Sequence, residues 1–329
     1  MKRKVIVIGS GIAGLAVSIR LKTKGYDVEV YEKNHNVGGK LSDFYIDNFR
    51  HDFGPKLFTM PDLIEDIFED AGVDIDDYFK YDKLDIACKY FWDDGYTFNA
   101  YSDNKRFTSE VKKKFSKEES RVKHYISRSK KKFNLVKKLF LEKSLHRIST
   151  YLSIDAFKAI INILQLNIFI TLNSLNKRYF RDKKLIQIFN RFATYNGSSP
   201  YLTSGIMSII QHLEHDLGVY MPKKGISDIS YSLFNLAKDI GVKFHFNSEI
   251  DQIIIKNKSV IGVMVNNINH KADIIISNMD VSLTYDWLLK GYNKPFFIKN
   301  YQPSSSAVVF YWNMNISFAN LNVHNIIFS

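Results

Sequence analysis

Cysteine is nearly absent from this sequence, because Cys88 is the single cysteine among 329 residues. One thiol excludes an intramolecular disulfide and any metal site built from cysteines. Such sparing use of cysteine is typical of proteins in the reducing cytoplasm. Redox chemistry in this chain would therefore depend on a cofactor.

Long apolar runs are lacking as well. The longest, residues 159–172, is interrupted by Asn162, Gln165 and Asn167, so it is too short and too polar to span a bilayer. No signal-peptide hydrophobic region precedes the apolar residues that begin at Lys4, and we expect no secretion or targeting segment. These absences favour a cytoplasmic protein.

Acidic residues are scarce in residues 101–150, where sixteen lysines and arginines outnumber five aspartates and glutamates and supply nearly all of the net charge of +12. Apolar residues recur there at three- and four-residue steps, which predicts a basic amphipathic helix. Such a helix can lie on an anionic membrane surface, or it can be a solvated lysine-rich face, and both interpretations stay open. The lysines that would face lipid are Lys130, Lys131, Lys132, Lys137 and Lys138.

The beginning of the chain has a strand, turn, helix, strand pattern. Residues 4–8 are apolar and mostly β-branched, a glycine-rich turn follows, a helical pattern runs to Gly25, and residues 28–31 form a second apolar run. This order implies a parallel sheet. We therefore predict an α/β fold with a Rossmann-type nucleotide-binding domain.

The remaining chain changes character twice. Residues 105–220 contain few glycines or prolines and are predicted to be largely helical, whereas strand patterns return after Gly225. A hairpin turn is expected at Asp94 and Gly95. The later strands are predicted to complete the first sheet, and they cover residues 242–246, 250–255, 260–265 and 272–277.

The predicted nucleotide-binding domain is accordingly discontinuous. It comprises residues 1–75 and 221–285, while residues 76–220 and 286–329 form a mostly helical domain that faces substrate and membrane. Residues 307–311 predict a strand in this second domain.

A G-x-G-x-x-G motif lies between the first strand and the first helix, a position that makes a dinucleotide site credible. The first glycine allows a tight turn, the second lets the backbone approach a pyrophosphate, and the third lets helix and strand pack closely. The phosphates would lie on the helix N-terminus, where unpaired N–H groups and the helix dipole favour negative charge. The motif consists of Gly9, Ser10, Gly11, Ile12, Ala13 and Gly14.

An acidic residue stands at the expected distance from this motif. Glu32 ends the second strand and Lys33 follows it. The Glu32 carboxylate is predicted to accept hydrogen bonds from a ribose hydroxyl, and an acid there disfavours a phosphorylated ribose. A glycine-rich turn with a surface glutamate is the structural alternative. These residues alone do not separate NAD from FAD.

A second glycine pair follows. Gly38, Gly39, Lys40 and Leu41 offer two residues without side chains and then a cation, which suits another backbone approach to the pyrophosphate. Residues 5–41 resemble the flavin-dependent amine oxidase and phytoene desaturase superfamily, whose second cofactor motif contains this pair. That family usually has arginine next, so Lys40 offers a point charge rather than a planar fork. The resemblance implies FAD as the cofactor.

The resemblance extends along almost the whole chain and narrows to the carotenoid desaturases, specifically the bacterial phytoene desaturases and hydroxycarotenoid 3,4-desaturases. By this resemblance Gly54 and Pro55 pass the flavin ring. The strand around Ile250 would meet the adenine with its backbone, although a plain core strand explains Ile250 equally well. The stretches that carry the resemblance are residues 51–61, 90–95, 191–201 and 277–280.

The implied activity is FAD-dependent desaturation of a carotenoid precursor such as phytoene, in carotenoid biosynthesis, with hydride transfer to the flavin. The implied partners are a long apolar isoprenoid or carotenoid substrate and a membrane surface approached peripherally. No nucleic acid is expected, and the oligomeric state is not indicated.

The sequence assigns no catalytic acid or base. Asp52 lies near the segment that passes the flavin, but it fits a turn-forming role equally well. His212 and His215 have the helical spacing of two metal ligands without a third, so a surface helix is favoured and no metal is expected.

Family members continue beyond the position of Ser329 into a glycine-rich segment that contacts the flavin, so the resemblance implies a chain shortened at its C-terminus. Three interpretations remain. The chain is a carotenoid desaturase, a truncated non-catalytic remnant that retains the nucleotide-binding fold, or a flavin amine oxidase-like enzyme, to which the extended similarity is weaker.

Overall fold

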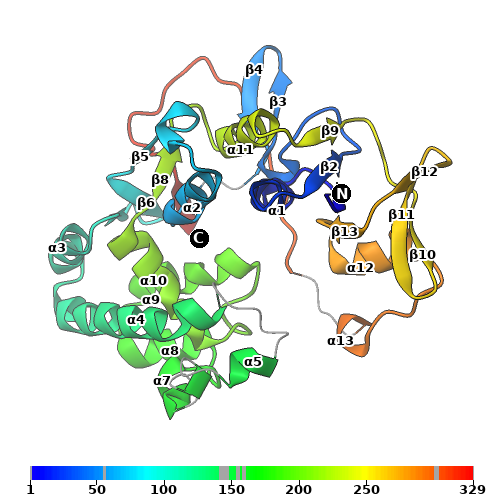
Figure 1. The fold of residues 1–329 in the computed structure, drawn as a ribbon. Helices are drawn as coiled ribbons and strands as arrows, with labels where there is room; N and C mark the ends of the chain where they lie inside the picture. The colour runs from blue at the N-terminus through cyan, green and yellow to red at the C-terminus, as the bar shows by residue number, and fades with distance from the viewer. Residues whose placement is uncertain are drawn as a thin grey trace. The chain divides into compact units, whose positions relative to one another are not determined.

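The computed structural model divides the chain into two compact units (Figure 1). Met1–Asp82 and Tyr220–Gln302 form the nucleotide unit, and Lys83–Val219 and Pro303–Ser329 form the helical unit. The structure describes residues 2–54, 57–140, 148–152, 156–157, 161–299 and 304–328.

The two units resemble the predicted domains in being discontinuous, but their limits differ. The prediction assigns residues 76–82 and 286–302 to the second domain, whereas both ranges belong to the nucleotide unit. The assignment of FAD to one domain and substrate to the other stays a prediction.

Four parallel strands form the central sheet of the nucleotide unit, in the order β13-β1-β2-β9. Val5, Ile6 and Val7 of β1 are fully buried. This burial explains the unbroken apolar run, because a central parallel strand is covered on both faces. The predicted α/β, Rossmann-type fold is thus confirmed. The strands are β1 (Lys4–Ile8), β2 (Asp27–Tyr31), β9 (Lys243–His245) and β13 (Ile274–Ser277).

Three helices pack with this sheet in one buried apolar cluster. They are α1 (Ile12–Thr23), α2 (Asp62–Ala71) and α11 (Asp228–Asp239). Helix α1 contacts both α2 and α11 (Figure 1). Leu15 of α1 and Leu233 of α11 are both fully buried in the cluster, so the start of α1 is held firmly at the end of β1.

The strands that follow β9 do not all join the parallel sheet. β10 (Gln252–Lys256), β11 (Ser259–Val265) and β12 (Ile268–Lys271) form a separate antiparallel sheet. The prediction that residues 250–255 and 260–265 complete the parallel sheet is therefore wrong, although β9 and β13 do complete it.

The turns explain this difference. Asn257 and Lys258 both have positive φ, and so do Asn266 and Asn267. Two successive residues in this conformation make a tight two-residue turn, and a two-residue connection can join only antiparallel strands.

Short elements complete the nucleotide unit. β3 (Asp43–Ile46) pairs with β4 (Phe49–Asp52), and β5 (Tyr81–Lys83) pairs with β8 (Tyr220–Pro222). Two short helices follow β13, namely α12 (Val281–Leu283) and α13 (Phe296–Lys299).

The helical unit contains a three-stranded sheet in the order β14-β6-β7. β6 (Ile86–Trp92) and β7 (Thr97–Tyr101) form an antiparallel hairpin, which confirms the predicted turn. β14 (Asn325–Phe328) lies parallel to β6. Within the described chain, residues 307–311 form no strand, so that prediction is wrong. An apolar run forms a strand only beside a hydrogen-bonding neighbour.

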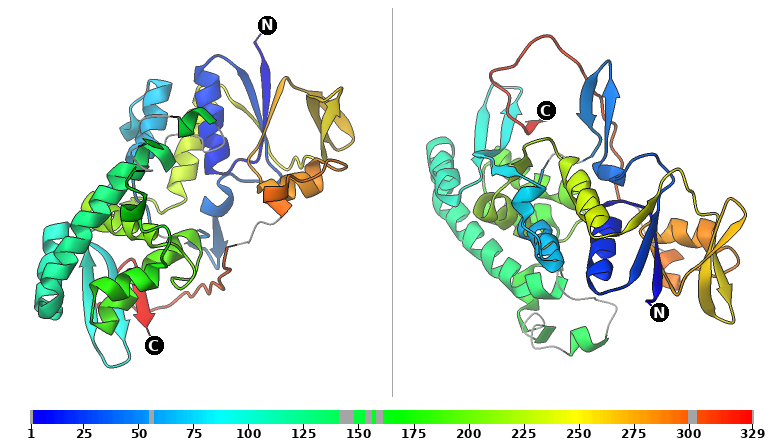
Figure 2. Two further views of the ribbon diagram at one scale, coloured as in Figure 1. Left: turned by 90° about the horizontal axis from the view of Figure 1, so that it is seen from below. Right: turned by 45° about the horizontal axis from the view of Figure 1, so that its top comes forward.

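The predicted helical character of this unit is confirmed, and its longest helix is α4, drawn in teal and green in Figure 2. Helix α4 contacts α3, α8 and α10. Among the described residues, no helix is both long enough and apolar enough to cross a membrane. The helices are α3 (Asn104–Lys114), α4 (Glu119–Phe140), α5 (Ile148–Tyr151), α7 (Ile163–Leu166), α8 (Leu172–Tyr179), α9 (Lys183–Asn190) and α10 (Ile210–His212).

Candidate functional site

The first glycine motif forms the turn between β1 and α1. Gly9 has φ +90°, a conformation that favours glycine, and its N–H donates to the Tyr31 carbonyl oxygen at 2.8 Å. Gly11 is the N-cap of α1 and has no side chain to cap it. The N–H groups of the first helical turn, which begins at Ile12 and Ala13, therefore remain available to a ligand, together with the positive end of the helix dipole.

Two glycines of this motif lie in close contact with neighbouring groups. A Cβ on Gly14 would overlap the Gly9 carbonyl oxygen, so the third glycine lets α1 pack directly against the end of β1. A Cβ on Gly11 would lie 2.9 Å from Asn278 Nδ2. The N–H of Asn278 in turn donates to the Ile8 carbonyl oxygen at 2.9 Å. Sequence reasoning did not assign Asn278 to the site.

The second glycine pair lies directly beside the first motif. The Gly38 N–H donates to the Ser10 carbonyl oxygen at 3.0 Å, and Gly38 pairs with Gly11 as an isolated parallel bridge. A Cβ on Gly39 would lie 3.6 Å from the Gly11 Cα. The two motifs, separated in sequence by a helix and a strand, thus form one backbone surface without side chains.

The residues after the glycine pair hold this surface in place. The Leu41 carbonyl oxygen accepts from Ser230 Oγ at 2.7 Å, while Lys40 is exposed. A Cβ on Gly54 would overlap the Lys40 carbonyl oxygen, so Gly54 also packs against this loop. Pro55 lies outside the described residues.

Glu32 is buried beside the glycine loop, with 6% of its surface exposed. Its Oε2 accepts from the N–H and the hydroxyl of Ser10, each at 2.8 Å. Its Oε1 accepts from the N–H and the side-chain amide of Asn34, each at 2.9 Å. The alternative of a surface glutamate is therefore wrong. Lys33 is exposed, and sequence reasoning missed the roles of Ser10 and Asn34.

Ile250 is a buried core residue that precedes β10 rather than lying in it. It belongs to an apolar cluster with Ile6, Tyr31 and Ile253. The contact of its backbone with an adenine stays a prediction.

Asp52 has a structural position at the start of α11. Its carboxylate oxygens accept from the N–H of Ile226 at 3.0 Å, the N–H of Ser227 at 3.2 Å and the Ser227 hydroxyl at 2.7 Å. A carboxylate at a helix N-terminus stabilises the helix. This set of bonds accounts for the residue without a catalytic role.

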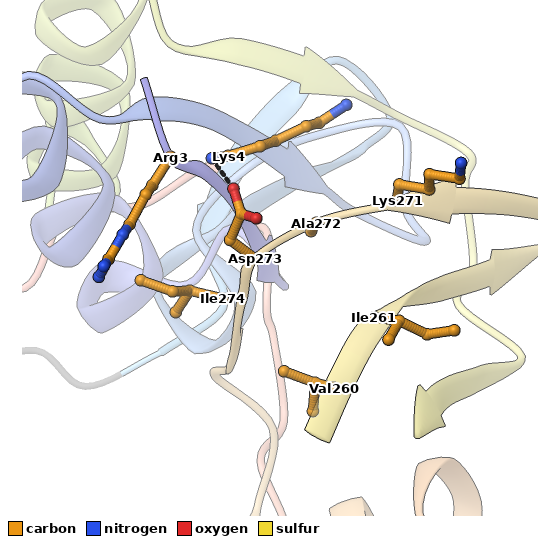
Figure 3. Close-up of a pocket in the computed structure, with 8 residues that line it drawn as sticks. All are labelled: Arg3, Lys4, Val260, Ile261, Lys271, Ala272, Asp273 and Ile274. Atoms are coloured by element: carbon orange, nitrogen blue, oxygen red, sulfur yellow. Dashed lines mark hydrogen bonds between the residues drawn. The ribbon is translucent and has the colours of Figure 1, made fainter. Parts of the chain in front are cut away.

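An open groove of about 580 Å³ lies at the other end of β1 (Figure 3). Its lining includes Arg3, Lys4, Val260 and Asp273, and the Lys4 N–H donates to Asp273 Oδ2 at 2.7 Å. Ligands of parallel sheets bind at the carboxyl ends of the strands, where the glycine motif lies. The groove is therefore separate from the candidate cofactor site.

A second group of buried polar side chains lies in the helical unit. Arg191 forms an ion pair with Glu214, which is fully buried. Tyr195 donates its hydroxyl to Glu214 Oε1 at 2.6 Å, and Arg191 Nε donates to the Tyr90 hydroxyl at 3.0 Å. Burial alone would raise the pKa of Glu214, but the Arg191 charge holds that pKa below its ordinary value.

The two helical histidines are buried rather than exposed, so the surface-helix interpretation is wrong. Burial lowers the pKa of both His212 and His215. His215 stacks on Phe107 with ring centroids 4.2 Å apart. In the part of the chain that the structure describes, no three His, Cys, Asp or Glu side chains are arranged to hold a metal ion.

Comparisons with known proteins agree with this geometry. The family model described as flavin containing amine oxidoreductase matches residues 12–292. The chain is 47% identical over 330 residues to a 1-hydroxycarotenoid 3,4-desaturase from Flavobacterium sp., covering 99% of this chain and 67% of that protein. A 4,4'-diaponeurosporene oxygenase from Staphylococcus haemolyticus is 27% identical, covering 100% of this chain and 66% of that protein. The chain thus spans about two thirds of these relatives' length.

Solved structures show the same fold. An oxidoreductase from Methanosarcina mazei matches with a TM-score of 0.64 at 18% identity, covering 91% of this chain and 66% of that chain. Wild-type putrescine oxidase bound to putrescine matches with a TM-score of 0.58 at 15% identity. The match covers 86% of this chain and 59% of that chain. At these identities the likeness concerns the fold alone.

The described residues fit the adenosine diphosphate part of FAD, since they present a bare backbone surface, a helix N-terminus and a buried carboxylate next to one another. The predicted cofactor is confirmed by the family match. This chain belongs to the flavin containing amine oxidoreductase family and, within it, to the carotenoid desaturases, which are FAD-dependent oxidoreductases.

Proposed function

We propose that this protein dehydrogenates a carotenoid precursor in carotenoid biosynthesis. The observation that carries the proposal is the 47% identity to a 1-hydroxycarotenoid 3,4-desaturase along 99% of the chain. That relative also favours a hydroxylated carotenoid over phytoene as the substrate. The more distant relatives named as oxygenases act on the same chemical class, so a carotenoid substrate is supported by several comparisons.

The residues of the nucleotide unit bind and orient the cofactor. The N-terminus of α1 and the adjoining glycine pair receive the pyrophosphate, and Glu32 accepts a ribose hydroxyl. When bound, the flavin supplies the hydride acceptor. The substrate has no charged group that the protein could recognise, so the helical unit must bind it by burying apolar surface.

We propose further that the protein lies in the cytoplasm and associates peripherally with a membrane, where such a substrate dissolves. The helical unit has large apolar side chains in water: Phe169 is 74% and Leu202 is 77% exposed. Their segments run side by side, because the Gly205 N–H donates to the Ile170 carbonyl oxygen at 2.7 Å. Exposed apolar groups of this kind mark interaction surfaces.

The lysines of α4 were expected to face the membrane, but they support membrane association less well than the exposed apolar side chains do. Lys132, counted with the lipid-facing lysines, is 3% exposed and donates to Ser208 Oγ at 2.8 Å, so that expectation is wrong for it. Lys130 contacts Asp216 at 3.1 Å. Lys131 is exposed.

Liposome flotation tests the membrane proposal. The double variant Phe169→Ser and Leu202→Ser should float less than the unmodified protein, because it buries less apolar surface in the bilayer. Ile268→Ser in the nucleotide unit removes another exposed apolar side chain, 62% exposed, and serves as the control. Equal flotation of all three proteins would contradict the proposed membrane face.

The desaturation itself is tested with flavin-loaded protein and carotenoids supplied in liposomes. A 1-hydroxycarotenoid should lose two hydrogens, seen as a mass lower by about 2 Da and a red-shifted absorbance because the conjugated system lengthens. Phytoene, tested in parallel, distinguishes the two substrate classes. Protein that holds flavin but converts neither substrate would overturn the proposed activity.

A further inference from the structure

The Glu32 carboxylate already has its acceptor positions in use. A carboxylate offers about four lone-pair sites. Ser10 fills two of them at Oε2, and Asn34 fills two at Oε1, all at 2.8 to 2.9 Å. A ribose hydroxyl that donates to Glu32 must therefore displace one of these donors.

Ser10 is not free to move away from Glu32. Its surface is fully buried, and it supplies both a backbone N–H and a hydroxyl to Oε2. Its carbonyl oxygen also accepts from the Gly38 N–H, which joins the two glycine motifs. Moving Ser10 would open the loop that receives the pyrophosphate.

The backbone of Asn34 is held as well. Its carbonyl oxygen accepts from the Asn247 N–H at 3.1 Å, and the N–H of Ser248 donates to the Glu32 carbonyl oxygen at 2.9 Å. The Asn34 side chain differs, because the residue is exposed. Its amide can rotate into water and exchange its hydrogen bond with Oε1 for one with solvent, at a cost no greater than the net worth of one hydrogen bond.

We propose that the Asn34 side-chain amide occupies the place of the adenosine ribose hydroxyl on Glu32 Oε1 and is displaced when FAD binds. Asn34 holds the carboxylate in its binding orientation and competes with the nucleotide for it. Three fixed donors remain after the exchange, so Glu32 keeps its position. The inference rests on FAD binding and not on carotenoid desaturation.

The test measures dissociation constants of the full chain after flavin removal, for FAD, ADP and FMN. Asn34→Ala removes the competitor, so the constants for FAD and ADP should fall about three- to tenfold, the equivalent of one hydrogen bond. FMN lacks the adenosine, and its constant should not change. Asn293→Ala changes an exposed asparagine elsewhere in the nucleotide unit and should match the unmodified protein.

Ser10→Ala is the second variant and should act in the opposite direction. It removes a fixed donor to Oε2, so the carboxylate is less well oriented and FAD should bind more weakly, with its fluorescence quenched at higher protein concentration. The two variants together separate displacement of Asn34 from general loosening of the loop.

Several outcomes would overturn the inference. Unchanged FAD and ADP constants in Asn34→Ala would mean that the amide does not compete. Weaker ADP binding would mean that Asn34 supports nucleotide binding, by orienting Glu32 or by contacting the nucleotide itself, and does not compete with it. Absence of FAD and ADP binding by the unmodified chain would also refute it. A chain that shows the expected binding pattern but converts no carotenoid contradicts only the proposed activity.

Discussion

Two buried glutamates, one in each unit, are stabilised in different ways. Glu32 receives its hydrogen bonds from neutral groups of Ser10 and Asn34. Glu214 is paired with the charged Arg191 and accepts the hydroxyl of Tyr195. A hydroxyl of a ligand can take the place of a neutral donor to Glu32, whereas the charge of Glu214 is already compensated by a cation inside the fold.

The largest effect is expected from breaking the ion pair of the helical unit. Arg191→Met leaves a fully buried carboxylate without its cation, so the free energy of unfolding should fall by about 3–5 kcal/mol. Arg20→Met removes an exposed partner of Asp70 and should cost at most about 1 kcal/mol. Chemical denaturation measures both. Similar small losses would show that Glu214 needs no cation.

The pH dependence of the unfolding free energy gives a second test of the ion pair between Arg191 and Glu214. The folded-state pKa of Glu214 is lowered, so its contribution to stability is present above the ordinary pKa of glutamate and is lost as the pH falls through the folded value. Without Arg191, burial dominates and raises that pKa, so protonation relieves the destabilisation. The deficit of Arg191→Met should therefore shrink between pH 7 and pH 4. A deficit that is constant over this range would contradict the assignment.

A substitution in the glycine loop of the nucleotide unit should reduce both the stability of the fold and its affinity for the cofactor. Gly14→Ala forces the start of α1 away from β1 because the new Cβ overlaps the Gly9 carbonyl oxygen, at a cost of about 1–3 kcal/mol. FAD affinity should fall by at least about tenfold, or 1.4 kcal/mol. Gly25→Ala strains a positive φ but meets no atom within 4 Å, so it should keep FAD affinity. Isothermal titration of both variants with FAD shows whether steric overlap or backbone strain reduces the affinity.

The smallest effect concerns Lys132, a buried amine whose hydrogen-bond partner, Ser208, is neutral. Burial, together with the Arg128 charge, lowers the pKa of Lys132 to about 8. The unfolded chain therefore holds this proton more tightly, and Lys132→Met should raise the free energy of unfolding by about 1–2 kcal/mol at pH 7. The gain should disappear as the pH rises from 8 to above 10. Lys131→Met, at an exposed position, is the control.

The glycine loop could be predicted because its chemistry depends on the backbone. Gly9, Gly11 and Gly14 act through their backbone conformation or through the absence of a Cβ atom. Both properties follow from the residue type alone. Asn278 and Asn34 could not be found in this way. Their roles depend on tertiary contacts that bring separate segments to the loop.

The helical unit was less predictable for the same reason. Arg191 lies in a stretch that carries the family resemblance, but nothing local pairs it with Glu214, which comes from a separate helical segment. The burial of Lys132 in a lysine-rich helix likewise depends on Ser208 of another segment. The antiparallel sheet was predictable in principle, because Asn257 and Asn266 are turn residues at hairpin spacing.

The order of strands in the parallel sheet has a consequence for synthesis on the ribosome. β1 and β2 are made first, yet β1 pairs with β13, where Val5 is opposite Ile274. At about 5–20 residues per second, translation of the chain between them takes many seconds. During this interval the edges of β1 and β2 await partners while most of the inserted helical unit can already fold. Until β9 and β13 leave the ribosome, the nascent chain therefore exposes apolar strands that can bind chaperones or aggregate.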